Sequence, residues 1–139
     1  MKLLSIISAG ILLFTTSCSS SKATTKTTTP LYETKWSLQK IHTDTGIQEV
    51  ETKAFIKFDE VKKSAGGNGS CNGFGSSITI NGNTITFKNI FSTKMYCQDV
   101  QKTEDAFFKQ LEKVNRFEIK GSTLLLYSDK DLLLEFRGT

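Results

Sequence analysis

Cys71 and Cys97 are the residues of the C-terminal part of the chain whose type and spacing could do chemistry. Paired cysteines can form a disulfide, ligate zinc or act as a redox-active thiol pair. A structural zinc site needs four ligands, but there is no second cysteine pair and the only histidine, His42, is far away in sequence. The C-x-x-C spacing of many reactive thiol pairs is also absent. A disulfide is favoured in an oxidising compartment, and a reactive thiol pair is the alternative.

The sequence before Cys18 indicates the compartment in which the protein folds. Cys18 follows Lys2, an apolar run over residues 3–14 and the small residues 15–17. The run is shorter than the roughly 20 residues that a membrane-spanning helix needs, and it is typical of a secretory signal peptide. The whole arrangement resembles a bacterial lipoprotein signal, in which the chain is cleaved before the cysteine and the thiol is acylated. An ordinary signal peptide with an accidental cysteine is the alternative.

We therefore predict that residues 1–17 are a lipoprotein signal peptide and that Cys18 is lipidated. Bacterial lipoproteins carry three acyl chains, and two or more chains give stable membrane anchoring. Ser19 follows Cys18 where Asp would retain a lipoprotein in the inner membrane, so the expected location is the outer membrane of the cell envelope. Export also favours a Cys71–Cys97 disulfide, which would stabilise the fold by roughly 3–4 kcal/mol by closing a loop of about 27 residues.

Other patterns in the chain give no catalytic or cofactor-binding constellation. His42 lies in a polar context without a recognisable nucleophile motif, and the glycines of residues 66–75 fit neither phosphate-binding pattern. Glu104 and Asp105 fall on what is expected to be the solvated face of a helix. Without residues 1–17 the chain has 17 basic and 14 acidic side chains, an excess too small to predict nucleic-acid binding. We predict a protein that is no enzyme and has no metal or cofactor.

The rest of the chain divides into a tether and one domain. Residues 18–30 carry the acylated cysteine and a flexible Ser/Thr-rich segment, which cannot bury enough apolar surface to fold. Residues 31–139 can enclose one core. Their period-two patterns and turn signals predict six or seven strands, and one helix is expected over about 99–114. The expected fold class is α+β, mostly β: a curled antiparallel sheet or half-barrel with the helix packed on it.

Aromatic residues are abundant, with ten Phe, three Tyr and one Trp. Most of them should belong to the core, because aromatic side chains bury large areas. A half-open barrel lined by Phe could instead hold a lipid or an apolar peptide. This gives an alternative function, a carrier similar to the pilot lipoproteins of secretins.

Two cysteine-containing motifs carry a resemblance to a known family. The first is the run 69–75 (GSCNGFG), and the second is the run 92–97 (STKMYC), followed by the predicted helix and terminal hairpin. Together with Trp36-x-Leu38 they resemble the META domain family of HslJ-like bacterial lipoproteins. The motif residues besides the cysteines are Gly69, Asn72, Phe74, Thr93, Lys94 and Met95. Lys94 departs from the family's usual Arg, and Gly73 from a larger residue.

The resemblance implies a β-rich curled sheet with a packed helix and no established catalytic residues. Family members are loosely tied to envelope stress, secretion and motility. We therefore expect a lipid-anchored, monomeric envelope domain with a non-catalytic binding or structural role, contacting an unknown envelope protein or apolar ligand. A hydrolytic enzyme is the less favoured alternative.

Overall fold

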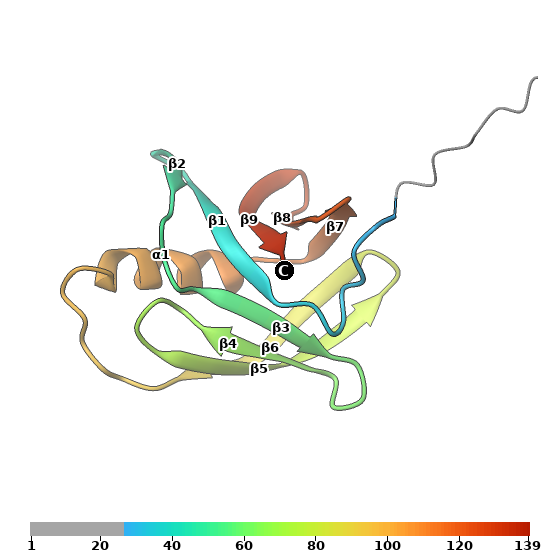
Figure 1. The fold of residues 1–139 in the computed structure, drawn as a ribbon, viewed down its shortest axis with the longest axis horizontal. Coiled ribbons are helices and arrows are strands. Elements are labelled where there is room, and N and C mark those ends of the chain that lie inside the picture. Colours follow the sequence, from blue (N-terminus) through green and yellow to red (C-terminus); the bar gives the residue numbers. More distant parts are fainter. Residues whose placement is uncertain (1–26) are drawn as a thin grey trace, which may run out of the picture.

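The computed structural model describes residues 27–139, in which nine antiparallel strands form one sheet with a single α-helix against it (Figure 1). The predicted signal peptide and Cys18 lie outside the described residues. The elements in chain order are β1 (Trp36–Thr43), β2 (Gly46–Glu49), β3 (Phe55–Asp59), β4 (Ser64–Asn68), β5 (Gly73–Asn81), β6 (Thr84–Ser92), α1 (Gln101–Leu111), β7 (Arg116–Lys120), β8 (Thr123–Ser128) and β9 (Asp131–Gly138).

The sheet curls until its two ends meet. Strands follow the order β2-β1-β3-β4-β5-β6-β7-β8-β9, and β1 also pairs with β9. Gly82 and Asn83 make the tight turn between β5 and β6, next to the Asn81–Thr84 pair, and Gly82 has a φ of +58° that its missing side chain permits. The predicted curled antiparallel sheet with one packed helix is confirmed. The helix is shorter than expected, and the strands number nine in place of six or seven.

The two unpredicted strands, β2 and β4, have few apolar side chains. All four residues of β2 are exposed and pair only with the end of β1, so no face of the strand is apolar. In β4 only Ala65 is buried, and two of its five residues are glycines. Period-two patterns depend on a buried face, and these strands therefore carry almost none of that signal.

The interior of the sheet is filled by aromatic and aliphatic side chains. Trp36, Phe107 and Phe136 are fully buried, and the Phe107 ring packs against those of Phe74 and Phe136 at centroid distances of 5.5 and 6.3 Å. Phe107 comes from α1, which packs on β1 and β9. The helix thus covers one opening of the curled sheet with an apolar stripe, as amphipathic helices do.

The start of the described chain and the connection between β6 and α1 lie at opposite ends of the molecule. Figure 1 shows the chain entering the described structure on the right, where the backbone N–H of Thr29 donates to Gly121. The connection between β6 and α1 lies at the opposite, left end. No helix among residues 27–139 has the length and apolar character needed to cross a bilayer. The connection between β6 and α1 contains residues 93–97 of the second cysteine motif.

Replacement of Phe107 by alanine should destabilise the domain by about 3–5 kcal/mol, because it opens a cavity at a fully buried ring. Urea denaturation of the purified domain measures this loss. Val61→Ala is the control, since Val61 is 92% exposed and its change should stay within about 0.5 kcal/mol. A loss below about 1 kcal/mol at Phe107 would show that the interior is not packed as described.

Candidate functional site

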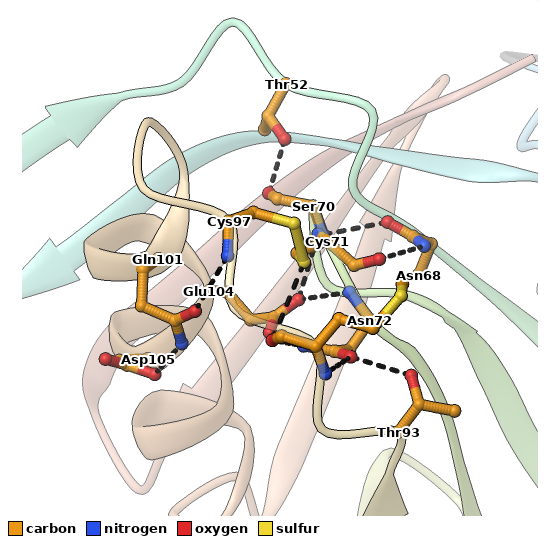
Figure 2. Close-up of a disulfide and its surroundings, with 11 residues drawn as sticks. Thr52, Asn68, Ser70, Cys71, Asn72, Thr93, Cys97, Gln101, Glu104 and Asp105 are labelled. Carbon is orange, nitrogen blue, oxygen red and sulfur yellow. Dashed lines mark hydrogen bonds between the residues drawn. A yellow bond between two sulfur atoms is a disulfide. The ribbon is translucent and has the colours of Figure 1, made fainter.

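The buried side chain of Asn72 joins the two cysteine motifs. Its Oδ1 accepts hydrogen bonds from Thr93 Oγ1 at 2.7 Å and from the Met95 backbone N–H at 2.8 Å. Its Nδ2 donates to the Met95 carbonyl at 2.9 Å and to Glu104 Oε1 at 2.5 Å. An asparagine amide offers two donors and two acceptor positions, and all four are used here. Figure 2 shows Asn72 at the centre of this cluster.

Glu104 ties the cluster to the helix. Its side chain is 2% exposed, and Oε2 accepts from the backbone N–H groups of Cys71 at 2.9 Å and Asn72 at 2.6 Å. Oε1 accepts the hydrogen bond from Asn72 Nδ2. A buried carboxylate is costly unless its lone pairs are satisfied, and three donors serve that purpose here. The segment before β5 is thereby held against the first turn of α1 (Figure 2).

The Cys71–Cys97 disulfide closes the same cluster covalently, which confirms the predicted pairing. The two Cα atoms are 5.9 Å apart, and both sulfurs are engaged, so the alternatives of a zinc site and a free thiol pair are wrong. The Cys97 carbonyl accepts from the backbone N–H groups of Val100 and Gln101 at the start of α1. The disulfide therefore lies directly before the N-terminus of α1, the helix that carries Glu104.

Gly69 lets the helix approach this closely. A Cβ atom at Gly69 would lie 2.7 Å from Phe108 Cζ and 2.9 Å from Glu104 Oε2, closer than side chains tolerate. Phe74, the motif's aromatic residue, is buried against Phe108 at a centroid distance of 5.4 Å. The small and the aromatic positions of the first motif thus both serve contact with α1.

The motif residues of the second run divide between inside and outside. Thr93 Oγ1 and the backbone of Met95 bind Asn72, whereas the Met95 side chain is 60% exposed. Lys94 is exposed, and no carboxylate of the described chain lies within ion-pair distance of it. The structure thus brings the motif residues of the two runs together, whereas Cys18, the predicted lipidation site, lies outside the described residues.

The sequence alone predicts the wrong environment for Glu104, a solvated helix face in place of the buried cluster. Glu104 was expected on this face together with Asp105, but only Asp105 is exposed. A signal was present in the spacing: Glu104 lies four residues after Val100 and three before Phe107, on the apolar stripe itself. A carboxylate on a buried stripe requires partners, and these come from residues 32 and 33 positions earlier.

The buried cluster supports an exposed apolar surface. Three of the five large hydrophobic side chains that are exposed in the described chain occur within six residues: Phe91 (69% exposed), Met95 (60%) and Tyr96 (76%). We call these three residues the 91–96 surface. Contiguous exposed apolar residues are typical of interaction sites. This arrangement is suited to binding a partner molecule. The backbone at Met95 is held by the Asn72 hydrogen bonds, and Cys97 is held by the disulfide.

His42, the histidine considered for catalysis, lies elsewhere. Its Nε2 is 2.7 Å from Glu135 Oε1, and its carbonyl accepts from Gln110 Nε2. It lines a polar groove between the β1–β2 turn and the β8–β9 turn. Among the described residues there is no group of three or more His, Cys, Asp or Glu that could hold a metal ion.

Comparison with known proteins agrees with these motifs. The family model of the META domain matches residues 29–138. The chain belongs to the META domain family. No curated protein matches the sequence. The resemblance seen in residues 69–75 and 92–97 is confirmed, and the matched residues include the disulfide, Asn72 and Glu104.

Solved structures also resemble this META domain. A protein from Burkholderia xenovorans, solved by NMR, has a TM-score of 0.66 at 19% identity, covering 78% of this chain and 83% of that one. A second protein solved by NMR has a TM-score of 0.56 at 18% identity, with 75% and 87% coverage. At these identities the likeness shows a shared fold and nothing about activity.

Glu104→Gln should destabilise the META domain by about 1–3 kcal/mol, because the amide replaces one carboxylate acceptor by a donor. In either amide orientation this donor faces another donor, the backbone N–H groups or Asn72 Nδ2. Urea denaturation of the oxidised protein measures the change. Asp105→Asn is the matched control, one residue along the same helix and exposed, and should change stability by less than about 0.5 kcal/mol. Equal effects of the two variants would contradict the assigned role of Glu104.

Proposed function

We propose that this protein is a lipid-anchored protein of the cell envelope whose META domain binds a partner protein without catalysis. The anchor is Cys18, on the strength of the preceding apolar run and small residues. Outer-membrane attachment is the location that Ser19 supports. The tether then lets the domain stand off the lipid headgroups while it searches for the partner.

The observation that carries the binding role is the preformed 91–96 surface. Ordering a loop on binding reduces affinity, whereas a segment already fixed in the free protein avoids that cost. Here the Met95 backbone is bonded on both its N–H and its carbonyl to a buried side chain, and a disulfide lies two residues on. Aromatic and Met side chains, which this surface presents, are enriched at protein interfaces.

The packed interior argues against the carrier alternative. An acyl chain or apolar peptide inside the curled sheet would need the space that Trp36, Phe107 and Phe136 fill. The aromatic residues expected to line a groove instead contact one another within one core cluster. Ligand binding in the interior would require these rings to leave, so we place the binding role on the outer surface.

The anchor is tested by Cys18→Ser. Wild-type cells fed an alkyne fatty acid should label the protein, which should sediment with the outer membrane. The Cys18→Ser protein should lose the label and at least nine-tenths of its membrane association, because no other lipidation site is proposed. Cys71→Ser is the control that removes a different cysteine. Undiminished label in the Cys18 variant would contradict lipid anchoring at this residue.

The binding role is tested by Phe91→Ser combined with Tyr96→Ser. Native gel electrophoresis of gently solubilised envelopes should show the wild-type protein in a complex and the double variant mostly as free protein. Ile47→Ser combined with Val61→Ser is the control, since these residues are equally exposed but lie elsewhere in the fold. The role is contradicted if the protein migrates alone in every case, or if the two double variants behave alike.

A further inference from the structure

The charge distribution of the chain singles out one stretch. Charged residues make up 23% of the sequence, yet residues 64–98 contain only two, Lys88 and Lys94, and not one Asp or Glu. This stretch forms β4, β5, β6 and the connection to the disulfide. Protein surfaces are normally rich in charges of both signs, and the cores of interfaces are depleted in them.

A bulge in β6 places Phe91 beside Lys88. Lys88 pairs with Ser77 and Phe91 pairs with Gly75. The step between the two pairs is therefore three residues along β6 but only two residues along β5. Asn89 is the extra residue, with φ of +54°. In a regular strand, residues three apart point to opposite faces; the bulge turns both side chains to the outer face.

The outer face next to Phe91 is flat. Gly75 has no side chain there, and a Cβ atom at this position would lie 2.6 Å from Phe91 Cζ, so the ring lies directly over the glycine backbone. Lys88 and Lys94 flank this ring along the chain. Both lysines are exposed, and neither forms an ion pair with a carboxylate of the described chain. They are therefore available to a partner.

The position of the surface favours a protein over the anchoring membrane. The connection between β6 and α1 lies at the end of the molecule opposite the point where the chain enters from the tether (Figure 1). Met95 and Tyr96 belong to this connection, which directly follows the end of β6 that carries Phe91.

We infer that the 91–96 surface, with Lys88 and Lys94, binds an apolar patch edged by Asp or Glu side chains on another envelope protein. This inference rests on the proposed binding function and adds the chemistry of the partner. The apolar side chains supply contact area, and the two lysines select for carboxylates and against basic surfaces. The absence of acidic residues over 64–98 removes the repulsion that an acidic partner would otherwise meet.

Site-specific photocrosslinking in living cells tests this inference on the full, lipidated chain. A benzophenone amino acid replaces Tyr96 and, as the control, Val61, which is also exposed. We expect a discrete protein adduct from position 96 and none from position 61. Mass spectrometry of the adduct should identify a contact peptide from another protein with Asp or Glu next to apolar residues.

Charge reversal then tests the role of the lysines. Lys88→Glu with Lys94→Glu should reduce the adduct at position 96 at least five-fold, while Lys62→Glu with Lys63→Glu leaves it unchanged. An adduct that persists at full yield, or one with a second copy of this chain, overturns the partner chemistry but leaves a binding surface. Adducts with lipid alone, or none at all, overturn the proposed function as well.

Discussion

The carboxylate of Glu104, buried between a helix and the segment before β5, is the constraint on which this META domain depends. It accepts two backbone N–H groups and the amide of Asn72. The amide in turn holds Thr93 and the backbone of Met95. Three parts of the chain therefore meet around two side chains, and the disulfide joins two of them covalently. A buried polar cluster of this kind specifies one arrangement, because each alternative leaves a donor or acceptor unpaired.

This constraint gives the family motif a physical meaning. Gly69 makes room for the helix. The Asn72 side chain bonds both the backbone N–H and the carbonyl of Met95, and Thr93 Oγ1 donates to the remaining acceptor position of Asn72 Oδ1. None of these roles is chemical in the catalytic sense. The same bonds fix the backbone of the exposed 91–96 surface at Met95. A bulge at Asn89 extends that surface onto the outer face of the sheet.

Much of this fold could be predicted from the sequence, but its central interaction could not. Strands with a buried face, the turn signal of residues 81–83 and the cysteine pair each carry a local signal. β2 and β4 carry none, since one is fully exposed and the other rich in glycine. Glu104 lies on the apolar stripe of the helix, yet its donors come from residues more than 30 positions away. Acidic residues on helices are usually solvated, and only the tertiary arrangement reveals this exception.

A double-mutant cycle between Asn72→Ala and Glu104→Ala tests the central claim most directly. The free energy of unfolding is measured for the wild type, both single variants and the double variant, all with the disulfide intact. Because the two side chains share one hydrogen bond inside one buried cluster, we predict a coupling energy of at least about 1 kcal/mol. Additive losses, within about 0.3 kcal/mol, would show that the two side chains act independently and would contradict this account.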